Sequence, residues 1–187
     1  MKNSIETKRI LATSLKELMK TKSFEKISIR ELTDNAGVNR QTFYYHFEDI
    51  YDLLKWTFQQ EALQLLAAHE SVNVWQEGLL QLFHYLDENR EFSTCALRSL
   101  GRSHLKRFFY TDIYNIIGRV VSEFGEKLHA PKDYMSFLTH FFTVSLASLV
   151  ESWLMGEMDE TPEKLIEMID LFIQDQLRGS KLRIEQQ

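Results

Sequence analysis

Hydrophobic residues recur every three or four positions along most of the chain, which is the spacing of one face of an α-helix. The first such stripe lies within about 4–22 and comprises Ile10, Leu11, Leu15, Leu18 and Met19. Further stripes predict helices over about 48–68, 71–88, 92–100, 106–128 and 133–155, and a last helix from Thr161-Pro162 to about 178. Only two prolines and seven glycines interrupt them. The pattern therefore predicts an all-α protein.

Two shorter helices are predicted between 28 and 47. Ser28 and Glu31 have the spacing of a capping box, which starts a helix over 29–36. Gly37 suits the left-handed turn that ends this helix, and Asn39 is a favourable cap for a second helix over 40–47. With the longer stripes, these make about nine helices.

The second short helix carries the chemistry that distinguishes this chain. Phe43 and Phe47 lie four residues apart and are predicted to face the core, which leaves polar and aromatic groups outside. An α-helix fits the major groove of B-DNA, where Arg pairs with guanine and Gln with adenine. Helix starts also offer N–H groups to phosphates. The candidate DNA contacts are Arg30, Asn39, Arg40, Gln41, Thr42, Tyr44, Tyr45 and His46.

A solvated helix hairpin within a bundle is the alternative interpretation, because such hairpins are frequent in all-α proteins. Solvent alone, however, gives no reason to expose two tyrosines and a histidine beside two buried phenylalanines.

The distribution of charge separates the chain into two predicted domains. The net charge is −5, but residues 1–47 hold nine basic and five acidic residues, a net +4, and residues 48–187 carry −9. A basic N-terminal part attracts phosphate at one end only, although charge alone does not exclude a solvated imbalance without a partner. We therefore predict a helix-turn-helix DNA-binding domain over 1–47 and a helical body over 48–187.

No catalytic residue, metal site or cofactor is predicted. The six histidines form no HExxH pair, and the single Cys95 lacks the spacing of a zinc site. His140 is expected to be a hydrogen-bonded core residue, and Glu151 a surface acid near a helix end. The N-terminus lacks the apolar core of a secretory signal, so the sequence predicts a cytoplasmic protein. The apolar run over 137–150 falls short of the roughly 20 residues that span a bilayer, which favours a buried helix.

The segment GVNRQTFYYHFEDIYDLL, preceded by a helix rich in Lys and Arg, resembles the N-terminal domain of the TetR family of bacterial transcription regulators. The match covers roughly 5–55 and is most specific over 42–47. The resemblance implies a homodimer on a palindromic DNA operator, with dimerisation through the last two helices, about 133–156 and 161–178. It also implies a body that binds an unknown small-molecule effector. From the aromatic residues of the body, the candidate effector contacts are Trp75, Tyr85, Phe108, Tyr114, Phe141 and Trp153.

Two details refine this resemblance. Tyr51-Asp52-Leu53-Leu54 and Leu100-Gly101-Arg102 resemble a Firmicute branch that includes regulators of dihydroxyacetone kinase operons. The family usually has a phosphate-binding Lys at the start of the fourth helix, where this chain has Ile50. We therefore expect weaker non-specific DNA binding than in a relative with that Lys.

The function expected from sequence is a homodimeric repressor that a small effector releases. Effector binding would shift the helix that begins near Asp49 and change the separation of the two recognition helices. The alternative is an activator or partner-dependent regulator whose body is a protein-interaction module.

Overall fold

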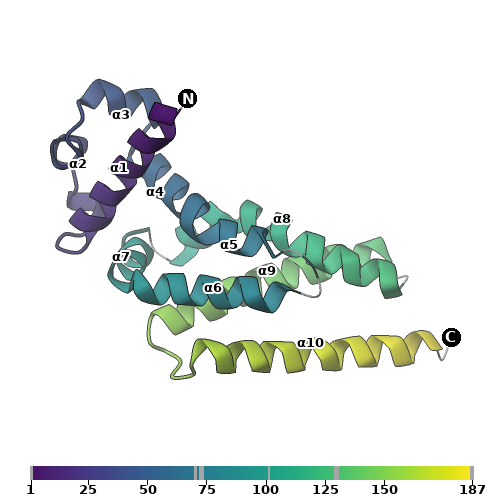
Figure 1. Ribbon diagram of the computed structural model, residues 1–187. Coiled ribbons are helices and arrows are strands. Elements are labelled where there is room, and N and C mark those ends of the chain that lie inside the picture. The colour runs from purple at the N-terminus through teal and green to yellow at the C-terminus, as the bar shows by residue number, and fades with distance from the viewer. Residues whose placement is uncertain (1, 70, 72–73, 101, 129–130, 186–187) are drawn as a thin grey trace. The chain divides into compact units, whose positions relative to one another are not determined.

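The computed structural model describes residues 2–69, 71, 74–100, 102–128 and 131–185, and its regular elements are all helical (Figure 1). The α-helices are α1 Lys2–Met19, α2 Ile29–Ala36, α3 Arg40–His46, α4 Ile50–Phe58, α5 Gln64–Ala67, α6 Trp75–Glu88, α7 Arg90–Leu100, α8 Arg102–Leu128, α9 Lys132–Leu154 and α10 Pro162–Glu185. A 3₁₀ turn, η1, covers Phe24–Lys26, and a π-helical segment, η2, covers Gln59–Leu63 between α4 and α5. The predicted all-α class is confirmed.

Most predicted helix limits agree with the structure, and the C-terminal one does not. The sequence predicts that the last helix ends at about 178, but α10 continues through Gly179 to Glu185. A single glycine costs a helix only about 1 kcal/mol and ends it only when the backbone turns left-handed. Among the described residues, the glycines with positive φ are Gly37 and Gly156, which both follow helix ends.

The chain divides into two compact units, the first formed by 1–62 and 88–109 and the second by 63–87 and 110–187. In the first unit, α1 packs against α2, α3, α4 and α7. Its core contains the fully buried side chains of Leu11, Leu15, Phe24, Leu32, Phe43 and Leu53. Phe58 of α4 stacks on Phe92 of α7 with ring centroids 4.9 Å apart, so α7 belongs to the core that supports the helix-turn-helix.

The second unit is built on contacts of α6 with α9 and α10. Phe83 lies edge-to-face with Trp153 at 4.9 Å, and the Trp153 Nε1–H donates to the Glu160 carbonyl at 3.1 Å. Gln76 of α6 donates to the Asp170 carboxylate of α10 at 2.9 Å. These bonds fix α6, the end of α9 and the first half of α10 as one core.

Two expectations for the body are wrong. Glu151 is buried, with 6% of its surface exposed, because α9 faces the core at this turn and places Trp153 and Leu154 there too. His140 is hydrogen-bonded, through Nδ1 to the Tyr110 hydroxyl at 2.6 Å, but it lies on the surface rather than in the core.

Helix α9 is also the one helix in the described part of the chain that is long and apolar enough to cross a membrane by length and composition. Only 28% of its most apolar window is buried. Core helices of soluble proteins pass the same test, so this finding alone is weak support for a span. The exposed apolar surface of α9 therefore requires a different explanation.

Candidate nucleic-acid interface and body groove

The turn between α2 and α3 is set by local hydrogen bonds. Ser28 Oγ accepts from the Glu31 N–H at 3.2 Å and starts α2. Gly37 then adopts φ 66°, and the Val38 N–H donates to the Thr33 carbonyl at 3.0 Å. Asn39 Oδ1 accepts from the Thr42 N–H at 2.8 Å and starts α3. Each of the three sequence signals for this motif therefore acts as predicted.

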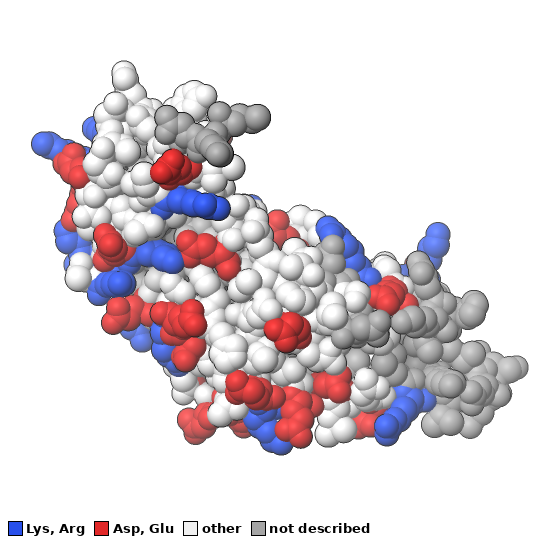
Figure 2. Space-filling view, viewed as in Figure 1, with Lys and Arg blue, Asp and Glu red and all other residues white. Residues whose placement is uncertain are grey.

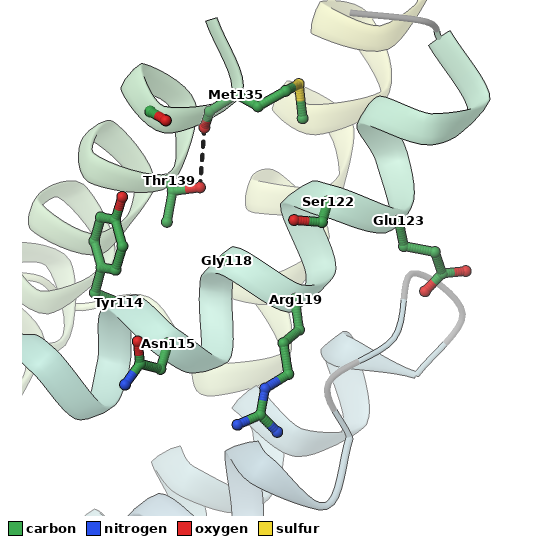
Figure 3. Close-up of a pocket in the computed structure, with 9 residues that line it drawn as sticks. Tyr114, Asn115, Gly118, Arg119, Ser122, Glu123, Met135 and Thr139 are labelled. Atoms are coloured by element: carbon green, nitrogen blue, oxygen red, sulfur yellow. Dashed lines mark hydrogen bonds between the residues drawn. The ribbon is translucent and has the colours of Figure 1, made fainter. Parts of the chain in front are cut away.

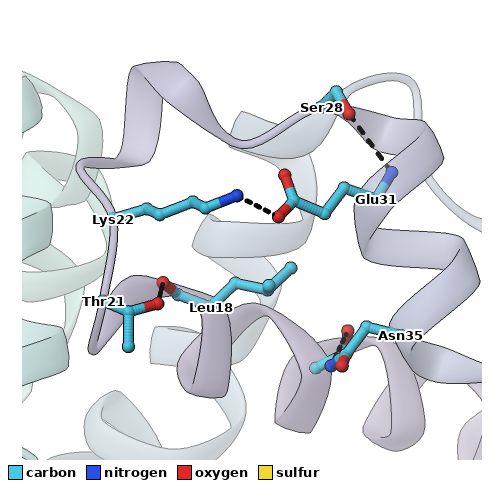
Figure 4. Close-up of polar contacts among 7 residues, drawn as sticks. Leu18, Thr21, Lys22, Ser28, Glu31 and Asn35 are labelled. Carbon is cyan, nitrogen blue, oxygen red and sulfur yellow. Dashed lines mark hydrogen bonds and ion pairs between the residues drawn. The ribbon is translucent and has the colours of Figure 1, made fainter.

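Helix α2 is fixed to α1 by polar contacts across their interface (Figure 4). Ser14 Oγ donates to the Leu32 carbonyl at 2.9 Å and accepts from Asn35 Nδ2 at 2.9 Å. The Lys22 ammonium pairs with the Glu31 carboxylate at the other end of the interface. Since α3 follows α2 after a short turn, these contacts also set the direction of α3.

Helix α3 has an inner and an outer face, as predicted. Phe43 and Phe47 are buried, with 0% and 3% of their surface exposed. Arg40 and Gln41 are exposed, and Tyr45 is 82% exposed, which is unusual for a large aromatic side chain. An exposed aromatic row beside an Arg and a Gln is a surface that can contact DNA bases and sugar-phosphate.

Three of the predicted DNA contacts also interact with other side chains of the protein. The Thr42 hydroxyl donates to Asn39 Oδ1 at 2.9 Å, the same oxygen that caps α3. The Asn39 amide NH₂ and the Thr42 methyl therefore remain for DNA. Arg30 Nε lies 3.8 Å from Asp34 Oδ2 on α2, and both side chains are largely exposed. An exposed ion pair of this kind is weak, so Arg30 can turn toward a phosphate.

The end of α3 forms a cluster with α1 and α4. His46 lies edge-to-face with Tyr45, with ring centroids 4.9 Å apart. The Lys8 Nζ lies 5.2 Å from the centroid of Phe47 and 5.7 Å from that of Trp56. Burial and, to a smaller extent, the Lys8 charge lower the pKa of His46 below its usual value. His46 is therefore neutral at pH 7.

The start of α4 is acidic. Asp49 Oδ1 caps the helix by accepting from the Asp52 N–H at 2.9 Å, and Asp52 Oδ2 accepts from the Glu48 N–H at 3.2 Å. Ile50, the first residue of α4, is half-buried. Two carboxylates thus surround the position where the family resemblance implies a Lys.

Basic and acidic side chains are interspersed on the visible face of the first unit (Figure 2). Lys16 pairs with Glu61 at 2.7 Å, so part of the +4 charge of residues 1–47 is balanced by an acid outside that segment, and Lys22 pairs with Glu31 within it. Attraction to phosphate therefore depends on a few cations rather than on a uniformly basic surface.

The body contains a groove of about 660 Å³ between α8 and α9 (Figure 3). Polar and apolar surface contribute about equally to its lining, which comprises Tyr114, Asn115, Gly118, Arg119, Ser122, Glu123, Met135, Ser136 and Thr139. Tyr114, Met135 and Thr139 face the space between the helices, whereas Arg119 extends from α8 away from α9 (Figure 3). A Cβ on Gly125 would lie 2.5 Å from Met135 Cε, so a larger residue there would displace the flexible end of that side chain.

Among the described side chains of the six predicted effector contacts, Tyr114 is the one that lines the groove. Phe141 is 42% exposed and stacks on Phe137, and Trp153 is in the core. Trp75 and Tyr85 are half-buried on α6, and the side chain of Phe108 lies outside the described residues. The set stays a prediction. The groove itself was not predicted from the sequence. The available signal was a pair of glycines on one face of α8, Gly118 and Gly125, which lie seven residues apart.

Within the described part of the chain, no group of three His, Cys, Asp or Glu side chains could hold a metal ion.

A capped helix-turn-helix with an outward-facing second helix, followed by a larger helical body, defines a DNA-binding transcription regulator. Two family models match the chain. Bacterial regulatory proteins, tetR family, matches 10–55, and Transcriptional regulator C-terminal region matches 73–175. The chain belongs to the TetR family of transcription regulators and is not an enzyme.

Two relatives share most of this architecture. The HTH-type dhaKLM operon transcriptional activator DhaS of Lactococcus lactis subsp. lactis (strain IL1403) is 32% identical over 127 residues, which cover 68% of this chain and 67% of that protein. A solved structure of a dihydroxyacetone kinase operon activator DhaS matches with a TM-score of 0.73 and 27% identity, over 93% of this chain and 97% of that one. The predicted resemblance to regulators of dihydroxyacetone kinase operons is thereby confirmed.

Proposed function

We propose that this protein is a transcription activator that binds a palindromic operator as a homodimer in the cytoplasm. The observation that carries the sign of regulation is the similarity to DhaS in both sequence and fold, because both matched proteins are described as activators. The proposal adopts the alternative to repression that the sequence left open. By the same similarity, the regulated genes would include those that encode a dihydroxyacetone kinase.

The α3 surface supports the DNA-binding part of the proposal. Arg40 and Gln41, exposed at the start of α3, would contact base edges in the major groove. Tyr44, Tyr45 and His46 would contact sugar and phosphate, as would Arg30, Thr42 and Asn39 at its rim. Arg40→Ala should weaken binding to the operator far more than binding to unrelated DNA, because it removes a base contact.

The exposed apolar side chains of α9 and α10 support the homodimer. Seven large hydrophobic side chains on these two helices are between 38% and 63% exposed, namely Tyr134, Phe137, Phe141, Val144, Met168, Leu171 and Phe172. Soluble monomers rarely expose so many contiguous apolar groups on one pair of helices. Two such pairs would form a four-helix interface, which also covers the apolar face of α9.

The groove between α8 and α9 supports control by a small polar molecule. Its hydroxyl, amide and charged groups suit a hydroxylated ligand better than a hydrophobic one. A protein partner that docks on the body is the alternative kind of signal. Thermal unfolding with dihydroxyacetone and glycerol as probes should show stabilisation by a ligand of the groove. That stabilisation should disappear in Gly118→Leu, whose side chain would fill the groove.

A reporter experiment tests the sign of regulation. The promoter regions upstream of the gene and of its neighbours are joined to a reporter, and expression is compared with and without the gene. An activator lowers expression when it is deleted, and a repressor raises it. Arg40→Ala in the same strain is the control, because an effect that requires DNA binding must be lost with it.

A further inference from the structure

Lys8 of α1 occupies an unusual position for a surface lysine. Its ammonium lies over two aromatic rings at once, those of Phe47 at 5.2 Å and Trp56 at 5.7 Å. These rings come from the end of α3 and from α4, so Lys8 marks the point where three helices of the first unit meet. Phe47 is buried and Trp56 half-buried, which makes both rings firm supports.

The other basic residues of this region are balanced differently. Lys16, Lys22 and Arg30 each lie within 4 Å of a carboxylate, on Glu61, Glu31 and Asp34 respectively. Among the described residues, Lys8 makes no such ion pair, and its charge is met by ring faces instead. Because a ring face satisfies a cation from one side, the N–H donors on the other side of the ammonium remain available to an anion.

The position of Lys8 relative to the recognition helix indicates which anion. Its charge is close enough to His46 to lower the pKa of that side chain, and His46 lies against Tyr45 on the outer face of α3. Lys8 therefore lies beside the surface proposed to face DNA. At the same end of the site, α4 starts with Ile50 between capping acids, and its first turn supplies no cation.

We propose that Lys8 binds a DNA backbone phosphate beside the end of α3, and that Phe47 and Trp56 position its ammonium for that contact. The proposal rests on the proposed function. Holding the flexible side chain of a lysine over two rings reduces the conformational entropy that is lost when the phosphate binds. Helix α1 would thus supply a phosphate contact at the end of α3, where the start of α4 has no cation to make one.

The test measures how salt weakens binding of the full-length protein to a mixed-sequence duplex of about 30 base pairs. Each phosphate contact adds about 0.9 to the slope of log affinity against log salt. We expect Lys8→Met and Lys8→Gln to reduce the slope by about 0.9 per protomer, and Lys8→Arg to retain it. Lys20→Met, the same change of charge just beyond the other end of α1, is the matched control and should leave the slope unchanged.

The role of the rings has a separate readout. Trp56→Leu should lower affinity at every salt concentration while the slope stays that of the wild type, because the cation is present but less well positioned. Trp56→Phe should recover part of the affinity. In the free protein, Lys8→Met should raise the pKa of His46, measured by NMR, and Lys8→Arg should not.

The outcomes separate the proposal from the function on which it rests. If wild type shows no salt-dependent DNA binding, the proposed function fails. If wild type binds but Lys8→Met and Lys8→Gln, folded by circular dichroism, keep the wild-type slope, Lys8 contacts no phosphate and only supports packing. An unchanged His46 pKa in Lys8→Met would overturn the placement of Lys8 itself.

Discussion

Three acidic side chains lie around the start of α4, and two of them already accept backbone N–H groups. Asp49 caps the helix and Asp52 bonds to the Glu48 N–H. These bonds keep both carboxylates in place at a position that, by the proposed function, faces the phosphates. Ile50 between them adds no positive charge. A basic residue at position 50 would therefore add the positive charge that this helix start lacks.

Ile50→Lys should restore a phosphate contact there. We expect the salt slope of non-specific binding to steepen by about 0.9 per protomer, and affinity to rise at low salt. The measurement is fluorescence anisotropy with a mixed-sequence duplex from 50 to 300 mM salt. Ile50→Gln, which has a similar length and no charge, is the control. Equal slopes for Ile50→Lys and wild type would show that this helix start lies away from DNA.

His46 gives the interface a pH dependence whose direction follows from its lowered pKa. Well above its ordinary pKa of about 6.5, His46 is neutral in both the folded and the unfolded chain, so it does not oppose folding. As the pH falls, the unfolded chain binds the proton first, and stability is lost until the pH passes the lower pKa of the folded state. Protonation also adds a cation to α3.

We therefore expect the wild-type salt slope to be the same as that of His46→Gln at pH 7.5 and to become steeper than it below about pH 6. Thermal unfolding of both proteins across this range measures the stability part. A steeper wild-type slope already at pH 7.5 would mean that His46 is charged in the complex.

At the scale of the helix, Asn39 joins two roles, because its side chain starts α3 and, by the proposed function, also contacts DNA. Asn39→Ala removes the cap and should cost about 1 kcal/mol of stability. Asn39→Asp keeps an acceptor for the Thr42 N–H but places a negative charge near phosphate. It should therefore melt close to the wild-type temperature while binding DNA more weakly.

Thermal unfolding and anisotropy on the same samples separate these two roles of Asn39. Should Asn39→Asp bind as tightly as wild type, the start of α3 is not close to the DNA backbone.

The helix-turn-helix was predictable from sequence because each of its determinants is local. Ser28, Gly37 and Asn39 act within a few residues of their own positions, and the structure confirms all three. The π-helical segment η2 was not predicted, since the hydrophobic stripe over 48–68 continues through it without a break. Whether a helix widens there depends on the helices that pack against it, which no local pattern records.

The groove between α8 and α9 was missed for the same reason. Apolar residues were expected to line an effector site, and the aromatic side chains of the body were chosen for that reason. In the structure, most of the described ones fill cores or lie on exposed faces, and polar groups make up about half of the concave surface. The groove is formed by residues of α8 and α9 together, a pairing of two helices that one sequence does not reveal.

At the scale of the whole molecule, the chain passes between its two compact units within helical or nearly helical segments. One crossing falls within η2, one at the last residue of α6 and one within α8. Each of these crossings therefore lies in a helical segment and not in a loop. Helix α7 packs on α1 and η1, so the first compact unit includes residues far beyond 47. The boundary at 47/48 therefore marks the end of the DNA-binding motif, and the division of the chain into domains there stays a prediction.

The exposed apolar faces of α9 and α10 give the clearest prediction at this scale. Phe137 and Leu171 are 58% and 63% exposed, the most among the large apolar side chains that the structure describes on these two helices. Burying side chains of this kind in a dimer would contribute about 1 kcal/mol each, whereas a glutamate in the same interface would cost several kcal/mol. We therefore expect the wild-type protein to have twice the 22.1 kDa mass of one chain. The double variant Phe137→Glu, Leu171→Glu should have the mass of a single chain.

Light scattering after gel filtration measures the mass of each variant, and Gln174→Glu, a new acid on α10 outside the apolar stripe, should stay dimeric. The double variant should also lose tight binding to a palindromic operator while keeping weak binding to a single half-site, because each protomer retains its own α3 surface. That combination ties the apolar faces to operator recognition, since two half-sites are bound tightly only when two recognition helices are held at a fixed spacing. A wild-type protein that bound the palindrome tightly at the mass of one chain would contradict the dimer and leave the apolar faces to another partner.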